Sequence, residues 1–398
     1  MIRPRHFFDE AFPGEANALV SLRVGYGARG WVEIEEVILD LMAAAPRVYG
    51  GRFPVLCHHA SMTSAVDDLL RLAGHEPSAK DIPYAGQTSY EEILRSVPAR
   101  KWRIINSHIP EAGFVPDTAY VVPPPLQRML NDKSRLADFV PGDHVLPRSV
   151  IDVRTLSTCR FDRPVVLKPV TDLPTGGGFG IMACRDAGAL SAALAFFSAR
   201  EAVLKGVVVE TLADFTATWC VQTLICPSGV RFVGAARQNV AEDCRWLGNH
   251  HGAGCAAPAA ARDLAITISE QARALGYSGF AGFDMGLTAA GRLFVFDLNF
   301  RVNGSLPQLL FDPAIRSDGG VSKNFRVRCK GAFHELAEVL RPYLERAVLF
   351  PLAGIDGAAH PGGESLVSGY LCAPTQAEVE RLEQAILSQP KFARNRLS

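Results

Sequence analysis

The chain has 398 residues, of which 48% are hydrophobic and 21% are charged. This length exceeds one ordinary hydrophobic core, so we expect two or three domains, and the apolar content is high enough to offset the entropy cost of folding. Lys plus Arg and Asp plus Glu both number 41, so the chain lacks the basic surplus that binds nucleic acid or an anionic membrane. We therefore expect small-molecule partners, with neither nucleic acid nor a membrane among them.

Nine cysteines are an odd number, and their scattered positions contain no CxxC pair and no zinc-ligand spacing. The N-terminal segment lacks the apolar h-region of a signal peptide, and no window approaches the roughly 20 apolar residues that span a bilayer. These features predict a soluble protein in a reducing, cytoplasmic setting.

The first part of the chain alternates strand-like and helix-like segments. They lie at Phe53–Cys57, Ser64–Ala73, Tyr90–Val97 and Arg103–Asn106. Such alternation predicts a βαβ domain over residues 1–125, and the Pro-rich Val121–Pro125 marks its end because proline interrupts both helices and central strands.

Residues 126–207 are predicted to form a small central subdomain that includes a lid. Its expected elements are a helix at Leu126–Phe139, a strand at Pro164–Val170 (PVVLKPV), the Gly-rich stretch TDLPTGGGFGIMAC at Thr171–Cys184 and a helix at Asp186–Arg200.

Residues 208–350 are predicted to form an antiparallel lobe, and residues 351–398 a C-terminal extension. The expected strands are Val207–Glu210, Thr218–Cys226, Val230–Val240, Ala281–Leu287 and Leu293–Phe300, with helices at Ala259–Leu275, Ala332–Leu340 and Gln376–Ser388. RWLGNHHGAG at Arg245–Gly254 and the Gly-rich Ala353–Ser365 are expected to be loops. The whole pattern predicts a mixture of α/β and α+β structure.

The segment FDMGLTAAGRLFVFDLNFRVNGS predicts a β-hairpin that carries chemistry. Strand alternation places Asp297, Asn299 and Arg301 on one face, and Asp284 on the preceding strand supplies a second carboxylate. Carboxylate and amide oxygens suit Mg²⁺ bound to nucleotide phosphates, and the arginine fork suits a phosphate or carboxylate. The alternative is an edge hairpin with solvated charges.

A lysine and a Gly-rich loop form the second candidate site. Lys168 lies within an apolar strand, where an ammonium group needs an anion, and Gly176, Gly177, Gly178 and Gly180 follow it. Such a loop leaves backbone N–H groups open to phosphate oxygens, although a glycine run alone is more often a mobile turn.

Five segments, in this order and spacing, resemble the ATP-grasp superfamily. They are LNDKSRL, PVVLKPV, TGGGFGI, VVVETL and the hairpin from GFDMGL to DLNFRVNGS, which together cover about residues 130–310. The resemblance implies an ATP-grasp fold: an N-terminal βαβ domain, a small lid subdomain and a C-terminal antiparallel lobe, with ATP between the two α+β lobes.

The resemblance also implies roles for individual residues. Lys133 and Lys168 would contact phosphates under the Gly-rich loop, Glu210 would receive the adenine amino group, and backbone groups of Thr211 and Leu212 would complete that edge. From the residues alone, Lys133 equally fits a solvated helix face, and Glu210 a solvated strand end.

At the hairpin, Asp284, Asp297 and Asn299 would hold two Mg²⁺ ions, with Mn²⁺ as an alternative. Arg301 would stabilise the acyl phosphate, and Arg237 would be a further phosphate contact or else an exposed strand arginine. Many superfamily members have Glu at the position of Asp297. The usual ribose-binding acid falls near Ala217 in this chain, with Asp214 as its substitute.

The implied activity is ATP-dependent amide formation between a carboxylate and an amine through an acyl phosphate. No biotin-carrier region is present, so the chain is more similar to stand-alone amino-acid or peptide ligases than to carboxylases, and the family implies a homodimer. The alternatives are a phosphotransferase of the same superfamily and a nucleotide-binding sensor without turnover.

Two other patterns carry weaker signals. Gly25–Gly30 fits GxGxxG, but LVSLR before it is a poor strand and no acidic ribose anchor follows about 20 residues later. The pairs His58–His59 and His250–His251 have no third ligand nearby in sequence, and adjacent strand side chains point to opposite faces, so neither pair predicts a metal site.

Overall fold

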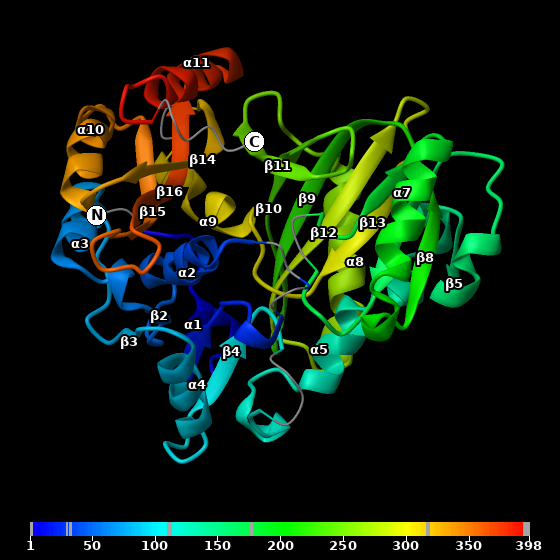
Figure 1. The fold of residues 1–398 in the computed structure, drawn as a ribbon, viewed down its shortest axis with the longest axis horizontal. Helices are drawn as coiled ribbons and strands as arrows, with labels where there is room; N and C mark the ends of the chain where they lie inside the picture. Colours follow the sequence, from blue (N-terminus) through cyan, green and yellow to red (C-terminus); the bar gives the residue numbers. More distant parts are fainter. Residues whose placement is uncertain are drawn as a thin grey trace.

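The computed structural model describes residues 3–28, 31, 34–109, 114–175, 178–315 and 319–392. It combines parallel and antiparallel sheets with helices on their faces, which confirms the mixed α/β and α+β prediction (Figure 1). None of the described helices combines the length and apolar character that a membrane crossing requires.

The N-terminal part is a small parallel α/β unit. Its elements are α1 (Phe8–Ala11), β1 (Ala18–Ser21), α2 (Glu36–Ala44), β2 (Leu56–His58), α3 (Ser64–Leu72), β3 (Ile82–Tyr84), α4 (Gln87–Ser96) and β4 (Arg103–Asn106). Strands β1 and β4 pair in parallel, as do β2 and β3, and a parallel bridge between Val20 and Val55 joins the two pairs. The βαβ prediction is therefore confirmed, and Ala18–Ser21 is a strand although its sequence looked poor for one.

The central part forms a four-stranded antiparallel sheet of order β5-β8-β6-β7. Its elements are α5 (Pro124–Asn131), α6 (Leu136–Phe139), β5 (Arg148–Ile151), β6 (Val165–Val170), β7 (Met182–Cys184), α7 (Ala187–Ser198) and β8 (Gly206–Thr211). Ala193 and Phe197 of α7 pack with Leu167 and Val209 in one small core.

A long antiparallel sheet of order β13-β12-β9-β10-β11-β14-β16-β15 spans the rest of the molecule. Its elements are β9 (Phe215–Cys226), β10 (Gly229–Val240), β11 (Trp246–Gly252), α8 (Ala259–Ala274), β12 (Gly279–Thr288), β13 (Leu293–Asn299), α9 (Leu306–Ile315), β14 (Val321–Lys330), α10 (Phe333–Glu345), β15 (Leu349–Ile355), β16 (Glu364–Ala373) and α11 (Gln376–Leu387).

The sheet has a separate core on each side. Helix α8 covers one face, where Leu264 and Ile268 pack with Val221 and Phe283. Helix α9 and the N-terminal unit cover the other face with the largest core. Figure 1 shows β14, β15 and β16 beside α2, α3 and α10 at one end of the molecule, and β5, β8 and α7 at the opposite end.

The predicted continuous helix Leu126–Phe139 is wrong. Helix α5 ends at Asn131, and Asp132 takes an extended conformation with ψ of 114°. Its carboxylate accepts from the Ser134 backbone N–H at 2.9 Å and starts a short 3-10 turn before α6. An aspartate that bonds to the backbone in this way favours helix starts over helix interiors, so it divides the segment.

The C-terminal region contains three strands that we did not predict, β14 to β16. The predicted loop Ala353–Ser365 is too long at both ends, because β15 continues to Ile355 and β16 begins at Glu364. Pro351 lies at a bulge where the β15–β16 register shifts, a position in a sheet that accommodates proline. The expected domain boundary at residue 350 falls inside β15, and the domain division as a whole stays a prediction.

The segment Arg245–Gly254, predicted as a loop, contains strand β11, which pairs with β10 and β14. Its glycines suggested a turn, but Gly248 and Gly252 have φ values of +131° and +127° within an extended segment.

Candidate active site

The predicted hairpin forms, and it brings its two carboxylates together. Asp284 on β12 and Asp297 on β13 are direct cross-strand partners. Gln238 Nε2 donates to Asp284 Oδ1 at 3.0 Å, and Asn299 Nδ2 approaches Asp284 Oδ2 at 3.4 Å. The facing pair comes from β-sheet register, because directly opposed side chains share a face of the sheet.

Burial and neighbouring charges shift the pKa values of the two carboxylates in opposite directions. Burial, followed by repulsion from Asp297, raises the pKa of Asp284 to about 7. Burial also opposes ionisation of Asp297, but Lys133, Lys168 and Arg301 together outweigh it and lower the Asp297 pKa. Lys133 Nζ lies 2.6 Å from Asp297 Oδ1, and burial lowers the lysine's own pKa. Lys133 is therefore part of this cluster and does not belong to a solvated helix face.

A second charged cluster lies on the small sheet. The Lys168 ammonium on β6 donates to Glu210 on β8 and, at 2.7 Å, to the Phe296 carbonyl oxygen of the hairpin strand. Lys168 and Glu210 are 5% and 2% exposed, so Glu210 is not a solvated strand end. Arg148 Nη1 approaches Glu210 Oε2 at 3.3 Å without a hydrogen bond, and that oxygen is buried with no donor. Glu210 can thus accept one more hydrogen bond.

Arg301 follows the hairpin and connects three parts of the structure. Its Nη1 donates to Asn131 Oδ1 of α5 at 3.1 Å, and its Nη2 donates to the Thr175 carbonyl oxygen beside the Gly-rich loop at 2.8 Å. Asn131 Oδ1 also accepts from the Phe300 backbone N–H at 3.0 Å. These contacts fix the guanidinium at the junction of the helix, the hairpin and the loop.

The described part of the Gly-rich loop is a tight turn that packs against β11. Gly178 and Gly180 have φ values of +85° and +72°, a region that favours glycine. A Cβ on Gly178 would lie 2.9 Å from the Cys244 carbonyl oxygen. Gly176 and Gly177, predicted members of the loop, lie outside the described residues.

The remaining predicted residues are more dispersed. The Thr211 N–H donates to Pro147 O at 2.9 Å and the Leu212 N–H to Pro164 O at 3.1 Å, so both N–H groups already have backbone hydrogen-bond partners. Asp214, the suggested ribose substitute, has a side chain that is 95% exposed.

Arg237 does not join the Asp284 cluster. It pairs across strands with Trp219, which packs in the core beneath α8, whereas its neighbour Gln238 points to the other face and bonds to Asp284. The Arg237 guanidinium lies 3.5 Å from the Gly254 carbonyl oxygen.

Sequence reasoning missed three residues that hold the site in place: Asn131, Arg148 and Gln238. Asn131 stands next to the lysine motif in LNDKSRL, so the motif itself could have indicated it. Gln238 and Arg237 are adjacent on β10, so their side chains point to opposite faces of the sheet. Only the pairing of β10 with β9 decides which of the two side chains faces the carboxylates. Arg148 gave no local signal, because its partners Lys133 and Glu210 are distant in sequence.

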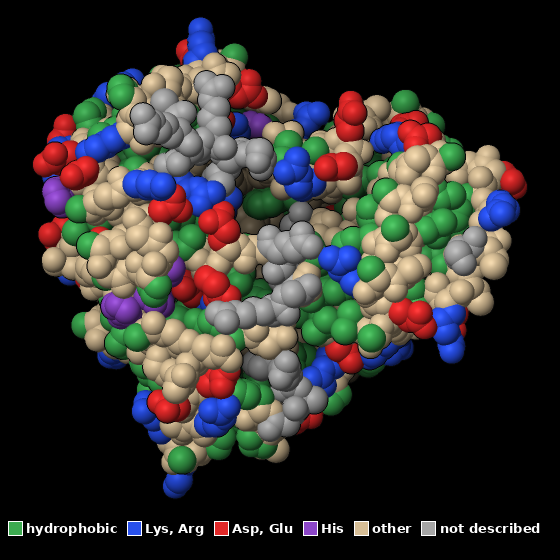
Figure 2. Space-filling view, in the orientation of Figure 1, with side chains coloured by type: hydrophobic (Ala, Val, Ile, Leu, Met, Phe, Trp, Pro, Cys, Tyr) green, Lys and Arg blue, Asp and Glu red, His purple; other side chains and the backbone are tan. Residues whose placement is uncertain are grey.

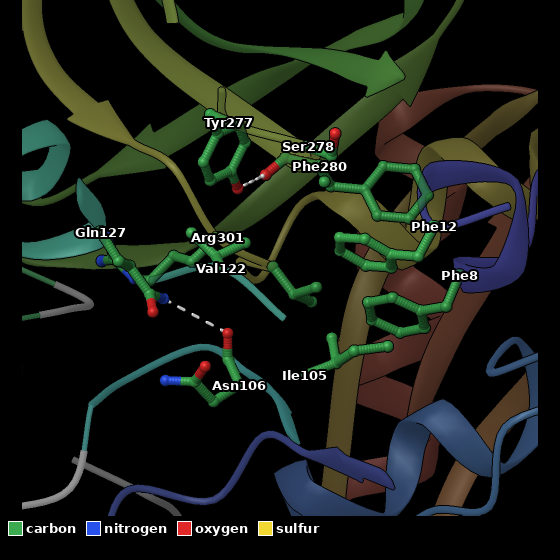
Figure 3. Close-up of a pocket in the computed structure, with 12 residues that line it drawn as sticks. Phe8, Phe12, Ile105, Asn106, Val122, Gln127, Tyr277, Ser278, Phe280 and Arg301 are labelled. Carbon is green, nitrogen blue, oxygen red and sulfur yellow. Dashed lines mark hydrogen bonds between the residues drawn. The ribbon is translucent and has the colours of Figure 1, made fainter. Parts of the chain in front are cut away.

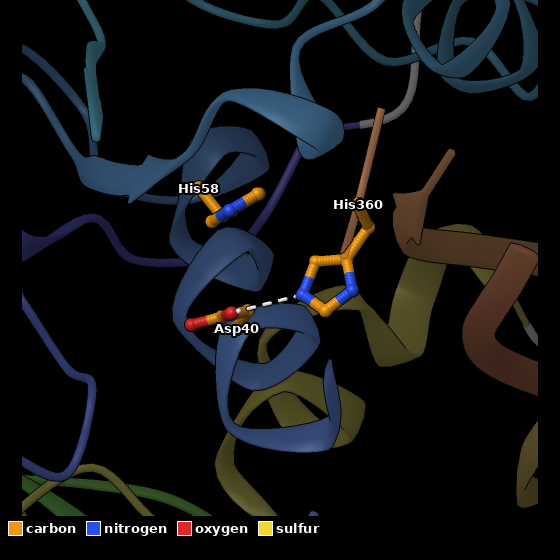
Figure 4. A group of neighbouring side chains, drawn as sticks. All are labelled: Asp40, His58 and His360. Carbon is orange, nitrogen blue, oxygen red and sulfur yellow. Dashed lines mark hydrogen bonds and ion pairs between the residues drawn. The ribbon is translucent and has the colours of Figure 1, made fainter. Parts of the chain in front are cut away.

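A separate buried cluster joins Asp40 and His58 of the N-terminal unit to His360 of the C-terminal region (Figure 4). Both imidazoles already use both nitrogens: His58 with Ala60 N and Ala85 O, and His360 with Gly362 N and Asp40 Oδ2. The cluster therefore ties the β15–β16 loop to α2, and a metal ion would have to replace these hydrogen bonds.

The strand-alternation argument holds for His250 and His251, which are adjacent on β11, but not for His58 and His59. His58 ends β2 and His59 begins a 3-10 turn, so their rings lie 4.4 Å apart and do not point to opposite faces. His250 pairs across strands with Arg237, and His251 Nε2 lies 3.1 Å from Asp312 Oδ1.

The charged clusters lie where the hairpin, the small sheet and α5 meet, and a hollow opens near the middle of the molecular face in Figure 2. Two partly buried carboxylates and an amide oxygen form a donor set suited to Mg²⁺. Burial and the neighbouring Asp297 raise the pKa of Asp284, and a cation at this position would favour its charged form. Lys133, Lys168 and Arg301 suit phosphate oxygens. Together these features define an ATP-dependent ligase of the carboxylate–amine type.

Comparisons with known proteins agree. Residues 147–299 match the family model described as "L-aspartate--L-methionine ligase, ATP grasp", and residues 15–128 match "L-aspartate--L-methionine ligase N-terminal domain". The chain belongs to the ATP-grasp superfamily, and it is an ATP-dependent ligase that forms a carbon–nitrogen bond.

Solved structures share the fold over almost the whole chain. An L-amino acid ligase from Bacillus licheniformis is 12% identical, with a TM-score of 0.54 over 94% of this chain and 97% of that chain. N5-carboxyaminoimidazole synthetase from Staphylococcus aureus, complexed with ADP, is 10% identical, with a TM-score of 0.56 over 97% of this chain and 99% of that chain.

Proposed function

We propose that this ligase joins two amino acids, with L-aspartate and L-methionine, named by the matching family, as the first pair to test. The observation that carries the proposal is the cluster of Asp284, Asp297, Lys133 and Arg301, which combines a cation site with groups for phosphate and carboxylate oxygens. A binder without turnover has no need for such a cluster.

The proposed reaction has two steps. A carboxylate oxygen of the first amino acid attacks the γ-phosphorus of ATP, which breaks the bond to the β-phosphate oxygen and gives an acyl phosphate and ADP. The uncharged amine of the second amino acid then attacks the acyl carbon, loses a proton and displaces inorganic phosphate. The enzyme contributes mainly by positioning the reactants and balancing their charge.

In this proposal Lys133 and Lys168 bind phosphate oxygens, and Arg301 binds the oxygens of the carboxylate as it becomes the acyl phosphate. Asp284, Asp297 and Asn299 would hold two Mg²⁺ ions, or Mn²⁺ as a substitute, which would supply positive charge to the ATP phosphates. The Gly-rich loop covers the phosphates and keeps water away from the acyl phosphate.

Glu210 supplies the adenine contact, because its buried Oε2 has no donor and can accept from the exocyclic amine. Thr211 and Leu212 contribute through their carbonyl groups, since their N–H groups are engaged in the sheet. Arg237 points to the opposite face from Asp284, so we assign it no direct role in phosphate binding.

A phosphotransferase that hands phosphate to one substrate is the second candidate. The ligase is favoured because the family model that matches residues 147–299 is that of a ligase. Two cavities meet at Arg301 and Gln127: one is lined mainly by polar residues, and the other, shown in Figure 3, is bounded largely by Phe8, Phe12, Phe280 and other apolar side chains. The apolar cavity has a volume of about 20 Å³, which has room for a water molecule and not for an organic substrate.

We also propose a cytoplasmic location and a homodimer. All nine cysteines lie within the described residues and are free, which is typical of a reducing compartment. A biotin carboxylase domain with the same fold, 14% identical and with a TM-score of 0.52, is described as a dimer. Light scattering coupled to size-exclusion chromatography measures the oligomeric state directly.

The function is tested by incubating the protein with ATP, Mg²⁺ and pairs of amino acids, starting with aspartate and methionine. ADP release that requires both amino acids, with a product one water lighter than their sum, is the expected result. ADP release with one substrate and a phosphorylated product would support the phosphotransferase, and ATP binding without turnover on any pair would overturn the ligase proposal.

A further inference from the structure

A polar cavity lies next to Arg301, between the N-terminal unit and the loop that precedes the Gly-rich turn. It is bounded by Ser107, His108 and Ile109 after β4, by one side of α5, and by Thr171 to Thr175. Arg301 and Gln127 also line the neighbouring apolar cavity, so both side chains stand at the border between the two (Figure 3).

Two guanidinium groups line the cavity, those of Arg128 and Arg301. Arg301 is held by Asn131 and the Thr175 carbonyl oxygen, and neither is a charged group. Arg128 makes no ion pair with any residue that the structure describes. Asp172 also lines the cavity, but its carboxylate pairs with Lys205 at 2.6 Å. Asp297 and Asp284 also act on the Arg301 charge, but Asp297 is itself paired with Lys133, so the cavity lining still places two cations where carboxylates can bind.

The same cavity also presents polar atoms that lack partners. Gln127 is buried and donates its Nε2 to Asn106 O at 3.3 Å, while its Oε1 has no hydrogen-bond partner. His108 Nδ1 is likewise enclosed without a partner. Burial and the neighbouring Arg301 charge lower the pKa of His108 to about 3, so the ring stays neutral and Nδ1 can accept a hydrogen bond.

We propose that this cavity binds the acidic amino-acid substrate of the ligase. The carboxylate to be activated lies at Arg301, the second carboxylate lies at Arg128, and the ammonium group donates to Gln127 Oε1 and His108 Nδ1. Two cations and two neutral acceptors match the two carboxylates and one ammonium of such a substrate. The inference rests on the proposed function and adds the residue, Arg128, that selects an acidic side chain.

The test compares Arg128→Gln with wild type, using calorimetric titration of aspartate and of asparagine in the presence of Mg²⁺ and a non-hydrolysable ATP analogue. Loss of a charged hydrogen bond should weaken aspartate binding at least about tenfold while asparagine binding changes little. Arg135→Gln is the matched control, since Arg135 is a partly exposed arginine paired with Asp138. Equal losses for both ligands in Arg128→Gln, or no loss, would overturn the assignment.

A second variant, His108→Leu, tests the acceptor side of the cavity. Aspartate and asparagine share the ammonium group, so both should bind more weakly, in contrast to the selective effect at Arg128. An unchanged affinity for both would remove His108 from the site. Titration needs no turnover, so wild-type protein that binds aspartate but forms no dipeptide would refute the ligase and leave the cavity assignment intact.

Discussion

Replacing Gly178 by alanine should impair ATP turnover without unfolding the protein. Gly178 has a φ of +85°, and its new Cβ would lie 2.9 Å from the Cys244 carbonyl oxygen. The left-handed conformation costs an L-residue about 1–2 kcal/mol, and a backbone oxygen cannot rotate away from the added carbon. A cost of about 1.4 kcal/mol alone lowers the population of this turn about tenfold, and the close contact adds to that.

The assay follows ADP release as ATP is varied, with thermal unfolding measured on the same samples. We expect kcat/KM for ATP to fall at least about tenfold, with little change in Tm because the turn lies outside the large cores. Gly276→Ala is the matched control: its φ is +92°, and a Cβ there meets nothing within 4 Å. Equal activity of the Gly178 and Gly276 variants would refute the argument that packing against Cys244 positions the loop.

Three further predictions concern the charged clusters and stability. Asp297→Asn and Arg301→Ala should each abolish dipeptide formation while circular dichroism shows an intact fold; full activity in either would remove the hairpin from the site. Lys133→Met, which removes the 2.6 Å contact with Asp297, should lower kcat at least about a hundredfold, whereas Lys391→Met at the exposed pair with Glu335 should not. Burial lowers the pKa of His75 to about 4, below its ordinary value near 6.5, so the stability from its neutral form is present above pH 6.5 and is lost as the pH falls toward 4. His75 should contribute about 2 kcal/mol to the stability that urea unfolding shows to be lost between pH 7 and pH 5, so the loss in His75→Gln should be smaller by about that amount. An unchanged loss in the variant would contradict this assignment.

Sequence reasoning succeeded where chemistry and periodicity lie close together along the chain. The hairpin carrying Asp284 and Asp297 follows from two-residue alternation on both sides of one short turn, and the structure pairs the two residues. Lys168 stood out because an ammonium group in an apolar strand needs an anion, and Glu210 is that anion in the structure. The roles proposed for these residues in catalysis stay predictions.

The rest depends on contacts between distant segments. Arg148 and His108 gain their places only when the small sheet, α5 and the N-terminal unit meet, and no local pattern encodes that meeting. Strands β14 to β16 were missed for a related reason. Their polar or proline-containing sequences become strands because pairing within the large sheet satisfies their backbone groups.

The most direct test of the account is transfer of oxygen from the carboxylate substrate to phosphate. Aspartate labelled with ¹⁸O in its carboxylates is incubated in unlabelled water with ATP, Mg²⁺, methionine and the wild-type protein, and the released phosphate is analysed by mass spectrometry. Formation of an acyl phosphate predicts one ¹⁸O atom in each phosphate and one dipeptide for each phosphate released. Dipeptide formation with unlabelled phosphate would contradict the proposed mechanism.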